Sequence, residues 1–117
     1  MKIHSNDPPR QFLIGAHHKV TIEHVANIKL ESNEQVTFVG PENTEVDVVK
    51  KEWGYYLSPS INKRLNNFGL TTFLVQNSRG NIFVMSVEPG GVAKFEQYLS
   101  ETNQKVIFNL SDVYCAT

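Results

Sequence analysis

The chain has 117 residues, the size of one ordinary domain, so it cannot form two independent cores of normal dimensions. A content of 40% hydrophobic and 20% charged residues excludes a disordered or fibrous protein. Eleven Lys and Arg against twelve Asp and Glu leave a net charge of −1, which argues against binding to nucleic acid or to an anionic membrane surface.

The two ends of the chain and its cysteine content predict a cytoplasmic protein. The single cysteine, Cys115, has no partner for a disulfide. The first ten residues are polar and contain a proline pair, so they lack the apolar run of a signal peptide, and no later stretch reaches the roughly 18 apolar residues of a membrane span. We expect a single domain, residues 1–117, in which residues 1–10 and 112–117 are flexible.

Strand patterns dominate the first half of the chain. Apolar and polar residues alternate from Lys19 to Leu30, which predicts a half-buried strand. Residues 34–39 and 44–51 are two further extended runs, and the Gly, Pro and Asn between them suit a chain reversal. These two runs therefore predict a hairpin.

A helix is expected to follow, from Ser58 to about Asn67. Ser58 can cap its first turn, and Pro59 would occupy the first helical position, where proline is tolerated. Gly69 stands where a left-handed residue would end the helix.

The second half of the chain predicts a hairpin, a helix and a final strand. Residues 70–76 and 81–87 flank a turn in which Gly80 can adopt a positive φ. Both strands carry apolar residues on both faces, so we expect both sides of their sheet to be covered. A helix over 92–101 and a strand over 105–110 complete the order βββαββαβ, an α+β fold with a largely antiparallel sheet of about six strands and two helices.

The distribution of charge singles out one candidate binding site. No carboxylate occurs among the thirty-five residues from Trp53 to Val87, whereas six acidic residues lie between Glu31 and Glu52. The start of the expected helix would attract an anion, and aromatic rings just before it could stack on a base or a sugar. The candidate binding residues are Trp53, Tyr55, Tyr56, Ser58, Ser60, Asn62, Lys63 and Arg64. The alternative is that the aromatic residues pack in a core or an interface and that Ser58 only caps a helix.

His24 interrupts the apolar face of the first expected strand. We interpret it as a hydrogen-bonded, partly buried histidine, with a role as ligand or general base as the alternative. The spacing of the four histidines supports no metal site, and the chain has neither a nucleophile elbow nor a glycine-rich phosphate loop. Catalysis therefore has little support, and no cofactor is expected.

Two short elements carry a resemblance to a known family. They are Trp-Gly-aromatic-Tyr at residues 53–56 and Pro-Ser-x-Asn-x-Arg-Leu at residues 59–65, with a looser likeness over roughly residues 22–110. With these elements the chain resembles a family of small uncharacterised bacterial proteins that are encoded among genes for surface polysaccharide (O-antigen or capsule) biosynthesis. The resemblance implies a biological setting and no reaction, and it does not extend to the region before residue 20.

Two functions are compatible with these observations. The first is a non-enzymatic accessory protein, self-associated as a homo-oligomer such as a homodimer, that binds a nucleotide-sugar, a sugar phosphate or a polysaccharide-synthesis enzyme through residues 53–64. The second is a small isomerase or epimerase for an activated sugar, with His24 or a neighbouring tyrosine as acid or base. The second requires His24 to open into a pocket shared with Tyr55, Tyr56 or Arg64. We favour the first because the catalytic set is incomplete, and because a small sheet with exposed edges favours self-association.

Overall fold

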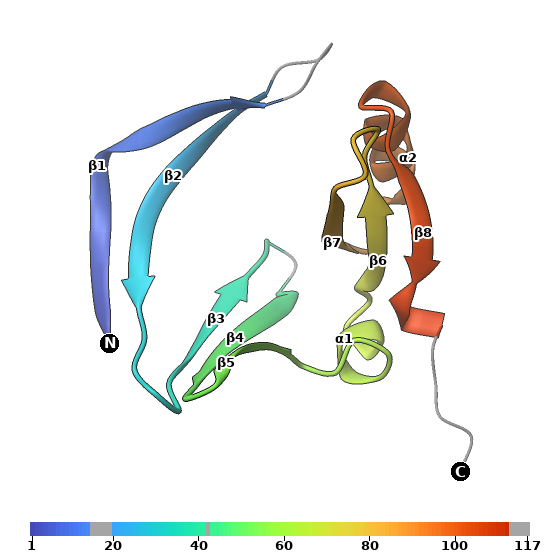
Figure 1. Ribbon diagram of the computed structural model, residues 1–117. Coiled ribbons are helices and arrows are strands. Elements are labelled where there is room, and N and C mark those ends of the chain that lie inside the picture. Colours follow the sequence, from blue (N-terminus) through green and yellow to red (C-terminus); the bar gives the residue numbers. More distant parts are fainter. Residues whose placement is uncertain (15–19, 42, 113–117) are drawn as a thin grey trace.

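The computed structural model describes residues 1–14, 20–41 and 43–112. Within this part of the chain the fold is α+β with antiparallel sheets, as predicted, but eight strands form three small sheets instead of one sheet of about six strands (Figure 1). The first sheet contains β1 (Lys2–Ile14) and β2 (Val20–Lys29). The second has the order β3 (Gln35–Val39), β4 (Glu45–Lys51), β5 (Gly54–Ser58), and the third the order β7 (Ile82–Val87), β6 (Thr71–Gln76), β8 (Lys105–Asn109).

Strands β1 and β2 form a long antiparallel hairpin, here called the arm, that curves over the central opening of the molecule toward the third sheet (Figure 1). Residues 1–10, expected to be flexible, belong to this hairpin almost entirely, and pairing runs from Lys2 opposite Lys29 to Ile14 opposite Val20. The register shifts between Ser5 and Arg10, a stretch that contains the two prolines, which have no N–H to donate. Strand β1 was not predicted, because a proline pair is typical of a break in regular secondary structure.

The second sheet confirms one predicted hairpin and adds a strand. The expected runs 34–39 and 44–51 are β3 and β4. The aromatic segment that was expected to precede a helix is instead strand β5, which pairs with β4 along its whole length. Three strands therefore stand where two were predicted.

The first helix is much shorter than predicted. Helix α1 covers only Arg64–Asn67, because Ser58 is the last residue of β5 and does not cap the helix. The N-cap position is Lys63, which makes no side-chain capping bond. Ser60 holds the turn before the helix: its Oγ accepts a hydrogen bond from the N–H of Arg64 at 3.2 Å, and its carbonyl accepts one from the N–H of Leu65 at 2.9 Å. Gly69 follows with a φ of +92°, so the predicted left-handed terminator is confirmed.

The third sheet and helix α2 (Val92–Glu101) contribute half of the buried apolar residues of the described chain. The predicted hairpin of β6 and β7 is confirmed, with Gly80 at a φ of +85°. Helix α2 packs on one face of the sheet, where the rings of Phe73 and Phe95 stack with centroids 5.3 Å apart. The buried apolar side chains of the described residues are Val49, Leu65, Leu70, Val75, Val87 and Leu99. The core is therefore small and lies mainly in the C-terminal half.

A 3₁₀ turn, η1 (Leu110–Asp112), follows β8 and closes one end of the third sheet. The backbone N–H of the buried Thr72 donates to Ser111 Oγ at 2.8 Å, and Thr72 Oγ1 lies 2.8 Å from Ser86 Oγ. Of the tail expected to be flexible, only residue 112 is described, and Cys115 lies outside the described residues. No helix in the described ranges is long and apolar enough to cross a membrane.

Candidate functional site

Trp53 and Tyr56 form an exposed aromatic platform at the turn between β4 and β5. Their ring centroids are 6.3 Å apart and their planes are inclined by 17°. Trp53 is 72% exposed and Tyr56 is 45% exposed. Full burial of a large apolar side chain stabilises a fold by about 1.5–3 kcal/mol, and most of that stabilisation is forgone at Trp53. Both rings are therefore open to solvent and available to a ligand, as in an aromatic binding surface.

A small hollow of about 280 Å³ adjoins Trp53, here called the turn hollow. It is lined by Ser32, Asn33, Lys51, Glu52 and Trp53. Asn33 has a φ of +67°, its N–H donates to the carbonyl of Lys50 at 2.8 Å, and its side-chain carbonyl accepts a hydrogen bond from Lys51 Nζ at 2.6 Å. These contacts hold the connection between β2 and β3 against the β4–β5 turn, so an aromatic ring adjoins amide, hydroxyl and charged groups.

A row of polar side chains shares the sheet face of Tyr56. Val49 pairs with both Gln35 and Tyr56, while Asp47 pairs with both Thr37 and Ser58. Because residues directly opposite each other point to the same face, these side chains lie together. Thr37 Oγ1 donates to Asp47 Oδ1 at 2.6 Å, which leaves the carboxylate able to accept further hydrogen bonds.

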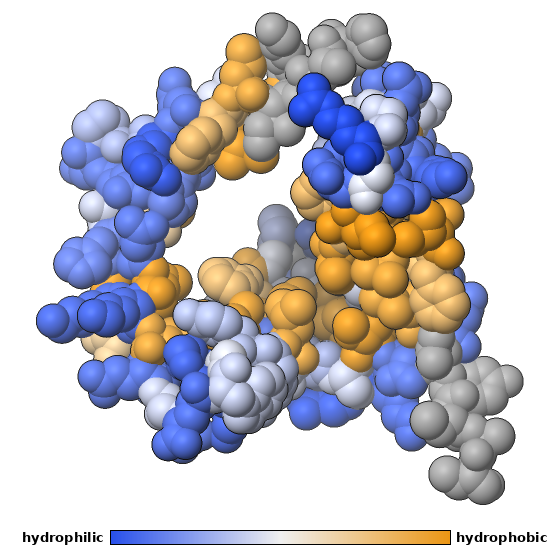
Figure 2. Space-filling view, viewed as in Figure 1, coloured by the Kyte–Doolittle hydropathy of each residue, from blue (hydrophilic) through white to orange (hydrophobic). Residues whose placement is uncertain are grey.

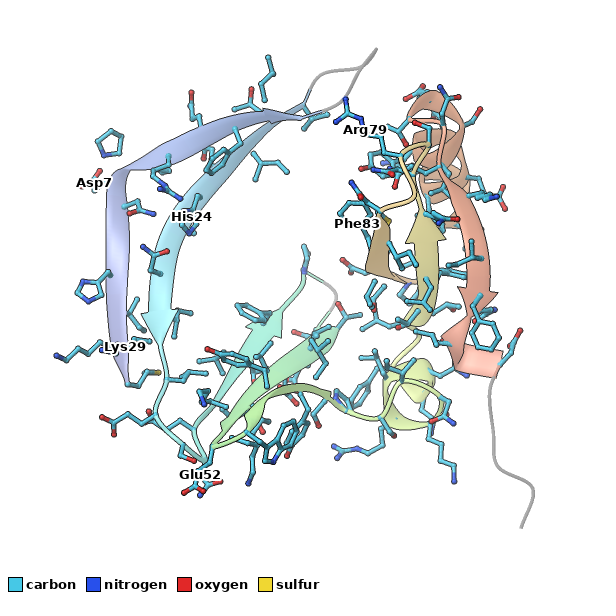
Figure 3. All side chains as sticks on the ribbon, in the orientation of Figure 1. Asp7, His24, Lys29, Glu52, Arg79 and Phe83 are labelled. Carbon is cyan, nitrogen blue, oxygen red and sulfur yellow. The ribbon has the colours of Figure 1, made fainter. Side chains whose placement is uncertain are left out.

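Residues 53–87 contain no carboxylate, but the fold places carboxylates from earlier in the chain beside them. Strand β5 pairs with β4, which carries Glu45 and Asp47 as well as two lysines, and Asp47 lies directly opposite Ser58. Glu52, labelled in Figure 3, lines the turn hollow beside Trp53. The charge asymmetry along the chain was the main reason to expect an anionic ligand. The pairing of the strands removes much of that asymmetry around the platform.

The other predicted binding residues do not join the platform. Tyr55 points to the opposite face of β5, where it is 65% exposed and its ring centroid lies 5.3 Å from Lys50 Nζ. Lys63 and Arg64 are exposed at the start of α1, whose single turn aligns few peptide dipoles. Asn62 is half-buried in the turn before that helix, and Ser60 Oγ accepts a hydrogen bond from the N–H of Arg64. The expected anion site thus lacks the long helix on which it depended.

His24 is a hydrogen-bonded, half-buried residue of the arm, which confirms that interpretation. Its Nδ1 accepts a hydrogen bond from Arg10 Nε at 3.1 Å, and its carbonyl oxygen accepts one from Asn6 Nδ2 at 2.9 Å. The ring centroid of Phe12 lies 6.3 Å away, and Figure 3 shows His24 on the inner side of the arm. His24 is not among the residues of the turn hollow, so the structure does not bring it to the platform.

Sequence analysis missed the polar part of this site, namely Ser32, Asn33, Gln35, Thr37 and Asp47. Strand β5 supplies the register that places three of them beside Tyr56, and that strand was not predicted. Within the described ranges, no three His, Cys, Asp or Glu residues are grouped as metal ligands. Comparisons of the chain with known protein families, with curated proteins and with solved structures give no match.

Proposed function

We propose that the chain is a non-catalytic saccharide-binding protein, an accessory factor in bacterial surface-polysaccharide synthesis. The observation that carries the binding role is the exposed stack of Trp53 and Tyr56 beside the polar turn hollow. A pyranose ring has an apolar C–H face that packs on a flat aromatic ring, and its rim of hydroxyls bonds to amide, hydroxyl and carboxylate groups. The biological setting rests on the family resemblance of residues 53–65.

The ligand class follows from the charges around the platform. Lys51 and Glu52 both line the turn hollow, so their opposite charges balance there, and Asp47 adds a negative charge on the sheet face of Tyr56. The site therefore offers no excess of positive charge to a phosphate. The turn hollow, at about 280 Å³, lies just below the roughly 300–1,000 Å³ of pockets that take drug-sized ligands, so it suits one sugar ring. We therefore assign the main contacts to a neutral sugar unit, either of an oligosaccharide or of a nucleotide-sugar.

Trp53 allows a direct test because it is the single tryptophan of the chain. Its fluorescence is measured while a panel of neutral gluco-, galacto- and manno-oligosaccharides and the matching nucleotide-sugars is titrated. We expect a saturable change with at least one neutral sugar. Tyr56→Ala should weaken that binding about tenfold or more, a loss of about 1.4 kcal/mol. Tyr55→Ala, one residue away on the opposite face of the strand, is the matched control and should leave the affinity unchanged.

The same titration separates this proposal from the anion site at the start of α1. If only nucleotide-sugars bind, and Arg64→Ala abolishes their binding while Tyr56→Ala does not, the ligand is an anion at α1 and the platform is not the site. No response to any sugar in the panel, confirmed by calorimetry, would exclude saccharide binding of either kind.

A further inference from the structure

The arm has one apolar face and one polar face. Ile3 pairs with Ile28 and Phe12 with Ile22, and these side chains share a face with Val20. Their exposed fractions are 57% for Ile3, 38% for Ile28, 45% for Phe12, 47% for Ile22 and 60% for Val20. The opposite face carries the pairs Lys2–Lys29 and Gln11–Glu23. The apolar face has the pattern of a buried surface and is nevertheless open to solvent.

The other described residues of the chain do not cover this face. Strands β1 and β2 pack on each other, and neither packs extensively on another element of the described chain. A hollow of about 680 Å³ separates Ile22 from Phe83, Met85 and Tyr98 on the other side of the central opening (Figure 2). Packed protein interiors leave few voids larger than a water molecule, and an isolated two-stranded hairpin is at best marginally stable in water. The arm therefore needs a packing partner that the described part of its own chain does not provide.

A second apolar surface is also open, here called the open sheet face: the side of the third sheet that faces away from α2. Leu74 in the central strand pairs with Val84 on one side and with Phe108 on the other, so the three form an apolar row across the sheet. Val84 is 53% exposed, Phe108 is 50% exposed, and the neighbouring Ile82 is 55% exposed. Figure 2 shows apolar residues gathered over this sheet. Both faces of its strands were expected to be covered, and α2 covers only one.

The surface area of the chain is large enough for a stable dimer. A folded monomer of 13.3 kDa is expected to expose about 6,500 Å², whereas this chain exposes 8752 Å². The excess is about 2,300 Å², and a standard stable interface takes only about 800 Å² from each partner. Two copies thus expose enough surface in excess to form a large interface of the kind found in obligate homodimers.

We propose that two copies associate by reciprocal arm exchange, in which the apolar face of each arm packs on the open sheet face of the other copy. A two-stranded sheet on a three-stranded sheet is an ordinary aligned sheet packing, and a two-fold axis makes both contacts at once. The apolar face of the arm includes one polar pair, Arg10 and His24, in which Arg10 Nε donates to His24 Nδ1 at 3.1 Å. Neither face carries a carboxylate in its paired positions, so no acidic group is buried by the contact. The contact does not use the platform on the second sheet, so arm exchange and saccharide binding are tested independently.

The first measurement is the mass in solution, by light scattering coupled to size exclusion. We expect the wild-type chain at twice 13.3 kDa. The arm variant Phe12→Lys/Ile22→Lys and the sheet variant Val84→Lys/Phe108→Lys should each dissociate at least a hundredfold more readily. Leu13→Lys is the matched control, because Leu13 is 63% exposed on the polar face of the arm, and it should remain a dimer.

Mixing the two double variants distinguishes arm exchange from other contacts. The intact arm of the sheet variant meets the intact sheet of the arm variant, so the mixture should form a dimer that neither variant forms alone. This complementation also shows that both variants are folded. A monomeric wild type, a dimer that persists in the arm variant, or a mixture that stays monomeric while circular dichroism shows both variants folded would each overturn the proposal.

Discussion

The arm and the third sheet are both antiparallel and both carry apolar residues along their strands, but their environments are opposite. In the third sheet Val75 is fully buried under the α2 side, whereas none of the described side chains of the arm is buried. An apolar pattern therefore predicts that a segment forms a strand, but an element from elsewhere in the fold decides whether that strand belongs to a core.

The largest expected difference between the two regions comes from matched leucine truncations. Leu70, immediately before β6, is 2% exposed, and Leu13 of the arm is 63% exposed. Leu70→Ala should lower the free energy of unfolding by about 3–4 kcal/mol because it leaves a cavity. Leu13→Ala should change it by less than about 0.5 kcal/mol. Urea denaturation measures both, and similar losses would show that the arm contributes to the core as the third sheet does.

The next effect concerns the joint that fixes α1 to the third sheet. Gly69 has a φ of +92°, and a Cβ there would lie 2.5 Å from Pro89 Cγ, an atom of a stiff ring. Gly69→Ala should destabilise the fold by about 2–3 kcal/mol. Gly90→Ala is the control, because its φ of +80° brings the same backbone strain while the space around it is open. Equal melting temperatures of the two variants would show that the contact with Pro89 is unimportant.

A smaller loss is expected at the end of the third sheet closed by η1. Ser111→Ala removes the acceptor of the Thr72 N–H, whose residue is 1% exposed. An unpaired buried donor costs about 1–2 kcal/mol, so thermal unfolding should begin at a lower temperature. Ser78→Ala, in the exposed β6–β7 turn, should be neutral. If Ser111→Ala is neutral as well, η1 does not secure this sheet.

The smallest effect is a pH dependence at the base of the arm. Glu34 accepts a hydrogen bond from the N–H of Glu31 at 2.8 Å and lies 3.1 Å from the amino group of Met1. These two partners lower the pKa of the Glu34 carboxyl below its ordinary value. A lowered pKa in the folded state stabilises the fold above the ordinary pKa, and this contribution is lost as the pH falls through the lowered value.

Glu34→Gln should therefore melt slightly below the wild type at pH 7, and the two melting temperatures should converge as the pH falls toward 3. A constant difference across that range would mean that ionisation of Glu34 does not tether the arm.

Local pattern predicted most elements of the fold and failed where a strand depends on distant partners. Turn chemistry at Gly80 and helical spacing over 92–101 located β6, β7 and α2. The grouping of strands into three sheets was missed because alternation does not specify which strands pair. The helix predicted from Ser58 was too long. A Ser-Pro pair is typical of a helix start, but here Ser58 is the last residue of a strand.

The candidate site was predicted in its aromatic half only. Trp53 and Tyr56 stood out by residue type, and the structure stacks them. Asp47 and Asn33 come to the same place through strand register and through a positive φ, neither of which a local pattern specifies. The expected preference for an anion is not supported near the platform for the same reason. The carboxylates of Asp47 and Glu52 lie outside the acid-free stretch of the sequence, and the fold places them near the platform.

Ser32 and Asn33 belong to two features of the molecule. They lie in the segment that connects the arm to the second sheet, and they line the turn hollow. Any molecule held in that hollow touches the segment that sets the direction of the arm. By thermodynamic reciprocity, a ligand that favours one arm direction is itself bound more tightly, by the same factor, when the arm already lies that way. Residues 30–34, the connection between β2 and β3, are thus a short physical link between occupancy of the hollow and the direction of the arm.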